Sequence, residues 1–235
     1  MNLLTLRRWK SYYTMNTVFH RLICEQINAA LWECCPPELI HQIRDHDIFA
    51  EIVSLTSEDA LSFTNKDPAS ERNPLNIINS YTSFKAVLHC RIANTLLKVS
   101  QLYEDVHSFS SILSSRGKLL SGAEIHHRSK IGRRLILDHG VGTVIGETSD
   151  IGDDCYILGG VTLGASGISN NPNGKRHPTI GNRVQIGAYS KIFGDIKIGD
   201  DVFIGPNCVI SQDIPSKSKI TLKSSIQVCR NDFAN

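Results

Sequence analysis

Residues 125–162 read in sixes as IHHRSK, IGRRLI, LDHGVG and, after two extra residues, IGETSD, IGDDCY and ILGGVT. Residues 180–215 continue as IGNRVQ, IGAYSK, IFGDIK, IGDDVF, IGPNCV and ISQDIP. Each unit begins with Ile or Leu, the fifth position is small or apolar, and seven units have Gly second. A fixed six-residue period is typical of a parallel β-helix, because one large apolar side chain per unit stacks on its equivalents in the next coil. We interpret the second-position Gly as supplying backbone angles that other residues avoid.

The six-residue phase breaks twice. Thr143 and Val144 are extra residues after LDHGVG, and residues 164–179 insert GASGISNNPNGKRHPT, which is rich in Gly, Asn and Pro. Insertions in a repeat array become loops that project from one face, and that face is often the binding face. We therefore expect the functional site near these two breaks.

The part of the chain before the repeats has helical periodicity instead. Apolar residues recur every three or four positions in three stretches: one that ends at Pro36-Pro37, one over about residues 39–55, and a long one over about residues 82–106. Between the last two, the polar segment SFTNKDPASERNP predicts a loop. The serine-rich residues 109–117 lead into the repeats.

This pattern predicts an α+β protein, with a helical N-terminal domain over residues 1–114. A parallel β-helix with a C-terminal tail is expected over residues 115–235.

Composition excludes several classes of function. The net charge is +2, from 25 Lys and Arg against 23 Asp and Glu, so nothing favours binding to nucleic acid or to a membrane surface. The seven cysteines form no CxxC pair, which argues against a disulfide framework and for a reducing compartment. No apolar run approaches the roughly 20 residues of a membrane span, and the start MNLLTLRRWK lacks the apolar core of a signal peptide. We expect a cytoplasmic protein.

Polar side chains with catalytic potential gather around the two breaks. Asp138 and His139 lie in the unit before the first break, Arg176 and His177 end the long insertion, and Glu124 precedes the first unit. A His near a carboxylate suits general-base catalysis, because its unperturbed pKa of about 6.5 allows it to accept a proton near neutral pH. On spacing alone, the alternative that these histidines are merely solvated stays open.

Several strings extend this pattern beyond the hexads. In chain order they are KDP at residues 66–68, EIH and KIG within residues 124–132, LDHGVG at 137–142, VIGET at 144–148, GGVTLG at 159–164 and KRHPTIG at 175–181. Over about residues 60–215 their order and spacing resemble the serine O-acetyltransferases, a group of hexapeptide-repeat acyltransferases. The resemblance implies a left-handed β-helix and a homotrimer with sites between neighbouring subunits. Whether two trimers join into a larger assembly stays open.

The resemblance also implies the reaction and its residues. L-serine and acetyl-CoA are the expected substrates, and the His that matches His139 removes the proton of the serine hydroxyl as it attacks the thioester. Glu124 matches the carboxylate that orients this imidazole. Transfer is expected to be direct, without an acyl-enzyme, and no metal is implied. The matches for substrate binding are Asp67 and Asp138 for the ammonium group and Arg176 and His177 for the carboxylate, and those expected at coenzyme A are Gly164, Ala188, Tyr189 and Lys223.

The chain departs from the family pattern at some of these places. Glu124 stands where an Asp is usual, His127 where a Pro is usual, and Tyr189 where a small residue is usual. The chain ends in FAN rather than in the terminal Ile that bacterial relatives insert into a sulfhydrylase, so we do not expect that complex.

Three alternatives remain beside the acetylation of serine. They are an O-acetyltransferase for another alcohol, such as a polysaccharide sugar or a different amino acid, a catalytically inactive relative, and a zinc hydrase. The last requires three converging His ligands.

Overall fold

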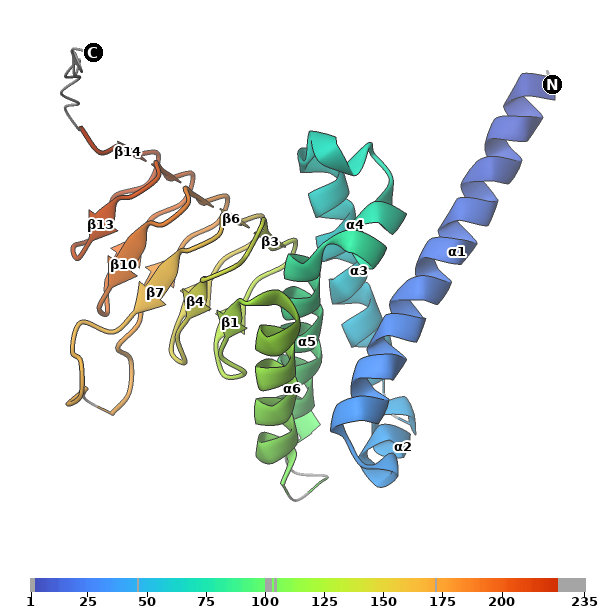
Figure 1. Cartoon of the computed structure of the whole chain (residues 1–235), viewed down its shortest axis with the longest axis horizontal. Coiled ribbons are helices and arrows are strands. Elements are labelled where there is room, and N and C mark those ends of the chain that lie inside the picture. Colours follow the sequence, from blue (N-terminus) through green and yellow to red (C-terminus); the bar gives the residue numbers. More distant parts are fainter. Residues whose placement is uncertain (1–2, 46, 100–102, 104, 172, 224–235) are drawn as a thin grey trace, which may run out of the picture.

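The computed structural model describes residues 3–45, 47–99, 103, 105–171 and 173–223. A group of helices at one end is followed by a stack of short parallel strands, and the stack carries the chain away from the helices (Figure 1). The predicted fold, an N-terminal helical part followed by a left-handed parallel β-helix, is confirmed. No helix in the described ranges is long and apolar enough to cross a membrane.

The helical part holds six α-helices and two 3₁₀ turns within the described residues. They are α1 (Leu3–Cys34), α2 (Pro37–Asp45), α3 (Ile48–Lys66), η1 (Pro68–Ser70), α4 (Pro74–Ser80), α5 (Thr82–Leu96), η2 (Leu97–Val99) and α6 (Val106–Ser121).

Two expected helices differ from this list. The stretch over residues 39–55 is divided between α2 and α3, and the long helix expected to reach residue 106 ends at Leu96. The polar segment over residues 62–74 is not all loop, because α3 continues to Lys66 before Pro68 favours an extended residue at Asp67. Asn73 then caps α4, its side chain accepting a hydrogen bond of 3.1 Å from the N–H of Leu75.

Helix α6 falls where only a connecting segment was expected. Its buried face combines Val106 and Leu113 with Ser110, Gly117 and Ser121, so an apolar stripe is missing from its sequence. A Cβ at Gly117 would lie 3.0 Å from Cβ of His89, which shows how closely α6 packs on α5. The expected boundary between residues 114 and 115 lies inside α6, and the chain leaves helical structure only after Ser121. The division into two domains stays a proposal.

The β-helix consists of fourteen short strands in the described range. They are β1 (Glu124–Ile125), β2 (Lys130–Ile131), β3 (Ile136–Leu137), β4 (Val144–Ile145), β5 (Asp150–Ile151), β6 (Tyr156–Ile157), β7 (Thr162–Gly164), β8 (Thr179–Ile180), β9 (Gln185–Ile186), β10 (Lys191–Phe193), β11 (Lys197–Ile198), β12 (Phe203–Ile204), β13 (Val209–Ile210) and β14 (Lys219–Ile220).

These strands form three parallel sheets. Sheet A has the order β1-β4-β7-β10-β13, sheet B the order β11-β8-β5-β2, and sheet C the order β14-β12-β9-β6-β3. Register pairs join equivalent hexad positions, as with Ile186 and Ile204, so the first-position side chains stack inside the coil. Ile145, Ile157 and Ile204 are fully buried there.

The first break in the phase lies in a turn rather than in a strand. Val141, expected at an interior fifth position, is 66% exposed, whereas Thr143 is 1% exposed and takes the interior place. Val144 pairs with Glu124 and Thr162 as an ordinary strand residue. The two extra residues are therefore accommodated in the turn over residues 139–142.

The second-position glycines serve a different purpose from the one expected. Their φ angles are not in the left-handed region, which is adopted instead by fourth-position residues such as Arg134, Asp154 and Asp201. A Cβ at Gly187 would lie 2.5 Å from the backbone N of Pro206 in the next coil. The glycine is thus required by the close approach of successive coils, because even one methyl group would collide with the neighbouring backbone.

Candidate functional site

The three corners of the β-helix are where side chains can gather outside the sheets. The AB corner, between sheets A and B, comprises residues 126–129, 146–149 and 165–178. The CA corner, between sheets C and A, comprises residues 138–143, 158–161, 187–190 and 205–208. The first break lies at the CA corner and the long insertion at the AB corner, so the two breaks project from different edges of one chain.

A cleft of about 510 Å³ lies where the helical part meets the CA corner. It is lined by Asp67, Ala69, Ser80, Tyr81, Thr82, Ser83, Asp138, His139 and Val141. The residues come from the α3–η1 link, the start of α5 and the turn after β3. The cleft therefore brings together Asp67 and the adjacent pair Asp138 and His139, predicted site residues that are about 70 positions apart in the sequence.

Asp67 is held in place by its own turn and by one aromatic neighbour. Its Oδ1 accepts a hydrogen bond of 2.9 Å from the N–H of Ala69, which caps η1, and its Oδ2 accepts one of 2.6 Å from the hydroxyl of Tyr81. The ring of Tyr81 packs edge-on against Phe63, with centroids 5.1 Å apart. The hydrogen bond to Asp67 and the charges of Asp67 and Asp138 raise the pKa of Tyr81 to about 12.

Asp138 has an equivalent partner. The hydroxyl of Tyr156, in β6, donates a hydrogen bond of 2.9 Å to Oδ2 of Asp138. Burial, and then the hydrogen bond to Asp138, raise the pKa of Tyr156. Both phenols therefore stay protonated donors at neutral pH, and each carboxylate keeps acceptor capacity because every carboxylate oxygen has two lone pairs.

His139 projects from a tight turn. Its φ is 58°, Gly140 and Gly142 follow with φ of 73° and 76°, and a Cβ at Gly140 would lie 2.9 Å from Cβ of Ser83. The turn thus requires small residues and packs directly on the start of α5. The side chain of His139 is 82% exposed, and its Nε2 lies 4.0 Å from Oδ1 of Asp138, which is too long for a hydrogen bond.

The other predicted substrate residues lie at the AB corner. The guanidinium of Arg176 pairs with Glu147, and its hydrogen bond lowers the pKa of that carboxyl group. His177 is 8% exposed, and its Nδ1 accepts a hydrogen bond of 3.2 Å from the N–H of Thr148. Burial, and then the charge of Arg176, lower the pKa of His177. The ring is therefore neutral near pH 7, with its proton on Nε2, and can act as a donor to an acidic group.

Glu124 does not meet His139 within one chain. Its Oε2 pairs with Nζ of Lys118 at 2.5 Å, and its side chain is 40% exposed. The proposed role of Glu124 in orienting the imidazole therefore stays a prediction for an assembly of more than one copy.

The four residues expected at coenzyme A are also distributed between the edges. Ala188 and Tyr189 lie at the CA corner, and the N–H of Tyr189 donates to the carbonyl of Gly159 at 3.0 Å, one coil beyond His139. Lys223 is exposed after β14. Gly164 ends β7 beside the AB corner, where a Cβ would lie 2.8 Å from the ring of Phe193. Their contact with coenzyme A stays a prediction.

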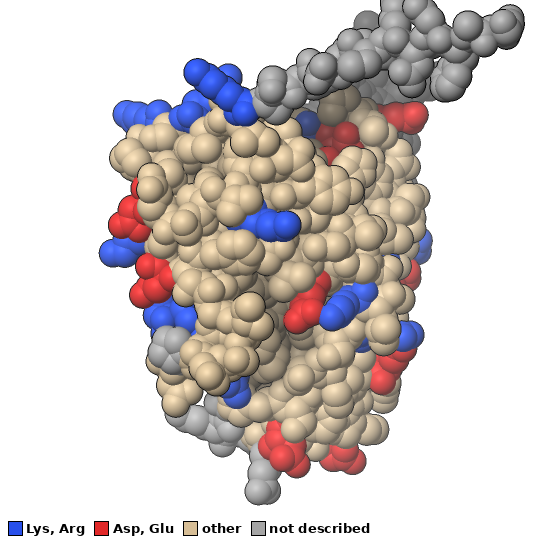
Figure 2. Space-filling view, turned by 60° about the vertical axis from the view of Figure 1, so that its left-hand side comes forward, with Lys and Arg blue, Asp and Glu red and all other residues tan. Residues whose placement is uncertain are grey.

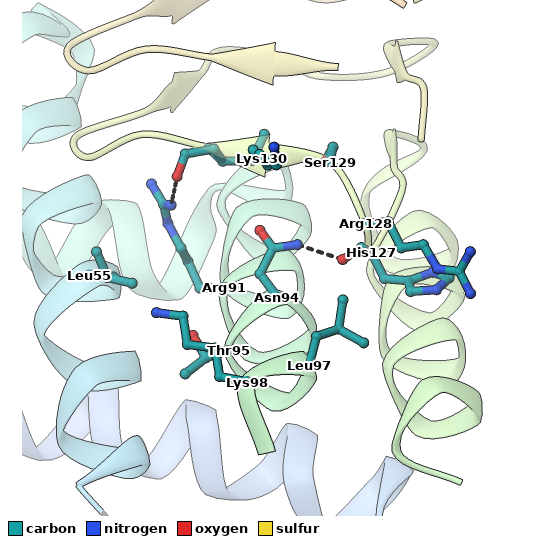
Figure 3. A pocket seen from close by; sticks show the side chains of 11 residues that line it. Leu55, Arg91, Asn94, Thr95, Leu97, Lys98, His127, Arg128, Ser129 and Lys130 are labelled. Atoms are coloured by element: carbon teal, nitrogen blue, oxygen red, sulfur yellow. Dashed lines mark hydrogen bonds between the residues drawn. The ribbon is translucent and has the colours of Figure 1, made fainter. Parts of the chain in front are cut away.

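A second cleft, of about 280 Å³, lies between α5 and the first coil (Figure 3). In Figure 3, Arg91 and Asn94 reach from α5 to the backbone of this coil, with hydrogen bonds of 2.9 Å to the carbonyl of Ile131 and 2.6 Å to that of His127. Lys98 and Lys130 contribute positive charge to the lining, but each is within 4.0 Å of a carboxylate, that of Glu51 or Asp150. The cleft therefore presents little uncompensated charge to an anion.

The histidines of the β-helix lie at two different corners. Among the described residues, no group of three or more His, Cys, Asp or Glu side chains is placed to hold a metal ion. His126 and His127 stack on each other at the AB corner, with ring centroids 4.4 Å apart, while His139 lies at the CA corner.

Tyr81 and Tyr156 were not identified from the sequence. Tyr156 lies at an outward position of a strand, and Tyr81 lies in a polar connection between two helices. Neither position indicates a functional site from the sequence alone, because that inference requires knowing that α5 packs against the CA corner.

The sequence matches known acyltransferases. A family model described as bacterial transferase hexapeptide (six repeats) matches residues 177–212. A serine acetyltransferase of Helicobacter pylori is 45% identical over 153 residues, which are 65% of this chain and 84% of the relative. One of Synechococcus elongatus is 41% identical over 151 residues, which are 64% of this chain and 58% of that relative.

Solved structures with the same fold extend this similarity into the helical part. Serine acetyltransferase isoform 3 of Entamoeba histolytica, in complex with cysteine, superposes with a TM-score of 0.70 at 30% identity and covers 89% of this chain and 72% of its own. Soybean serine acetyltransferase complexed with serine superposes with a TM-score of 0.70 at 28% identity and covers 85% of this chain and 79% of its own.

Proposed function

The chain belongs to the serine acetyltransferase family, and we propose that it transfers the acetyl group of acetyl-CoA to the hydroxyl of L-serine at the cleft beside His139. The product is O-acetyl-L-serine, and the reaction belongs to the biosynthesis of cysteine. The single observation that carries this assignment is the meeting of Asp67, Asp138 and His139 in one cleft, which places two carboxylates suited to bind an ammonium group beside a candidate base.

The chemistry requires a base because an alcohol is a weak nucleophile. His139 accepts the hydroxyl proton as the serine oxygen attacks the thioester carbonyl. A bond from carbon to oxygen forms, the bond from carbon to sulfur breaks, and the proton held by His139 is available to the departing thiolate. Asp67 and Asp138 bind the serine ammonium and so fix the hydroxyl near the imidazole. No Ser or Cys stands in a nucleophile setting beside His139 in the sequence, and no hydrogen bond joins His139 to Ser80 or Ser83, the two described serines that line the cleft. Both observations favour direct transfer.

The active assembly contains more than one copy, and we take it to be a homotrimer. The imidazole of His139 is 82% exposed in one chain, which leaves a general base open to water, and Arg176 and His177 lie at a different corner. A neighbouring copy that brings its AB corner to the CA corner would supply both a cover and a cationic partner for the serine carboxylate. Figure 2 shows a face with few charged side chains near its centre and most of its charged residues along its edges.

Coenzyme A is proposed to lie along the CA corner. Ala188 and Tyr189 lie at this corner, in the second coil after the one that carries His139. No metal is needed for the proposed steps. The cytoplasmic location stays a prediction from the sequence.

Release of free CoA from acetyl-CoA tests the proposal. Purified protein is assayed with L-serine, L-homoserine and a panel of sugars, beside a His139→Ala variant and a His41→Ala control, since His41 is an exposed histidine of α2. We expect release that depends on serine, a fall of about 10²- to 10⁴-fold in kcat for His139→Ala, and full activity for His41→Ala.

Other outcomes would contradict parts of the proposal. Release with a sugar but not with serine would show that the enzyme acetylates a different class of acceptor, while His139 could still act as the base. Equal activity of His139→Ala and His41→Ala would show that His139 is not the catalytic base. Initial-rate patterns of the ping-pong type would show an acyl-enzyme and contradict direct transfer.

A further inference from the structure

We propose that Tyr81 and Tyr156 are positioning residues that aim the carboxylates of Asp67 and Asp138 at the acceptor amine, and so set the preference of the cleft for an amino acid over a plain hydroxy acid. The inference rests on the proposed function, because it names how the same cleft selects its acceptor.

The first step is the electrostatic problem of the cleft. Asp67 and Asp138 both line it, and no Lys or Arg is among its lining residues. Two like charges that line one cleft repel each other unless a cation or hydrogen-bond donors compensate. The side-chain donors to the two carboxylates are the two phenols, at 2.6 Å from Asp67 and 2.9 Å from Asp138, and Asp67 also accepts from the backbone N–H of Ala69 at 2.9 Å.

The second step is that the four groups act as one cluster. The charges of both Asp67 and Asp138 contribute to the raised pKa of Tyr81, and they contribute again to that of Tyr156. A protonated phenol has a single O–H group and can donate only one hydrogen bond. Each tyrosine therefore holds Oδ2 of its aspartate. The remaining lone pairs of the carboxylate, which on Oδ1 of Asp67 are shared with the N–H of Ala69, are left for a cationic group.

The third step is that the tyrosines are themselves fixed. The ring of Tyr81 packs at 83° against Phe63, which is 2% exposed, and Tyr156 packs against the helical core that contains Ile136. Their hydroxyl groups therefore have defined positions before substrate arrives, and the carboxylates need little reorganisation when they bind an ammonium group.

The test compares two ligands that differ only in the amine. 3-Hydroxypropionate is L-serine without its amino group, so the ratio of their dissociation constants isolates what the cleft gains from that group. Calorimetric titrations measure both constants for the wild type, Tyr81→Phe and Tyr156→Phe. The Phe variants keep the rings and remove only the donors. Tyr103→Phe is the control, because Tyr103 packs edge-on against Phe109 and does not line the cleft.

We expect the preference for L-serine to fall about tenfold in Tyr81→Phe and in Tyr156→Phe, with little change for 3-hydroxypropionate and none in Tyr103→Phe. Thermal melts check that each variant is folded. An unchanged ratio, or an equal weakening of both ligands, would overturn the proposal, since a merely structural role moves both constants together.

The binding assay also separates this inference from the proposed function. Wild-type protein that prefers L-serine but releases no CoA would contradict the acetyl transfer and leave the tyrosines to be judged on the ratio. Wild-type protein without any preference for L-serine would overturn both.

Discussion

The guanidinium of Arg91 binds the carboxylate of Asp59 through two hydrogen bonds, of 2.7 and 2.9 Å, with the two side chains 2% and 0% exposed. The pair also closes the open end of the β-helix. Arg91 donates to the carbonyls of Ile131 at 2.9 Å and Gly132 at 2.6 Å, and Asp59 accepts from the N–H of Leu135 at 2.8 Å. These backbone groups belong to the first coil and have no preceding coil to bond to. The helical part therefore completes the β-helix and fixes its position relative to α5, which carries part of the cleft.

Replacement of Arg91 by Met should be strongly destabilising. It leaves the Asp59 carboxylate buried without its cation and two carbonyl groups without a donor, for which we expect a loss of about 3–5 kcal/mol in the free energy of unfolding. Arg21→Met, at the exposed pair of Arg21 and Glu25, should cost less than about 0.5 kcal/mol. Guanidinium denaturation of both variants measures the difference. Similar midpoints for the two would contradict the capping role of Arg91.

The stacking of the coils could be predicted because it depends on a six-residue period that is visible in the amino-acid sequence. One apolar residue in six is buried in every coil whatever the outer side chains are, and so the fold follows from Ile145, Ile157 and their equivalents. The helices were harder to predict from the sequence than the coils. The buried face of α6 is built from Ser110, Gly117 and Ser121, and small residues at a close helix contact do not produce an apolar stripe.

The candidate site could be predicted only in part. The first break in the repeat lies next to Asp138 and His139, which line a cleft, since insertions leave the sheets at corners. That Arg176 and His177 lie at a different corner follows from which turn of the coil each insertion occupies. The hydrogen bonds of Tyr81 and Tyr156 depend on how α5 docks on the CA corner, and no local pattern encodes that docking.

Gly146→Ala should impair the site without breaking the coil. A Cβ at Gly146 would lie 2.1 Å from the imidazole of His177, so the ring must leave its place beside Thr148. Because His177 is proposed to bind the serine carboxylate, we expect the KM for L-serine to rise about tenfold or more, with a smaller effect on the KM for acetyl-CoA.

Gly205→Ala is the matched control for this change. Gly205 has the same second position in its hexad, and its nearest neighbour to an added Cβ is the carbonyl oxygen of Ile220 at 3.3 Å. Steady-state kinetics of the two variants should therefore differ. A KM for L-serine that rises equally in both would show that the methyl group acts through the coil and not through His177.

His127 should make the protein less stable as the pH falls. It is 9% exposed and stacks on His126, and burial, followed by the charges of His126 and Arg128, lowers its pKa to about 4, although Glu147 opposes this shift. In the unfolded chain its pKa is about 6.5. Between these two values the unfolded state holds a proton that the folded state does not. The contribution of the neutral His127 to stability is therefore complete above about pH 6.5, falls through the window, and is fully lost below about pH 4.

Removal of the titrating ring should flatten this decline. We expect His127→Gln to lose about 2 kcal/mol less stability than the wild type between pH 7 and pH 5, since the other groups that titrate in the window, His126 and His177 among them, remain in both proteins. Denaturation curves of the two proteins at both pH values give the difference of differences. Parallel declines would mean that His127 takes up its proton in the folded protein as readily as in the unfolded chain, and that its burial at the AB corner does not keep the ring neutral.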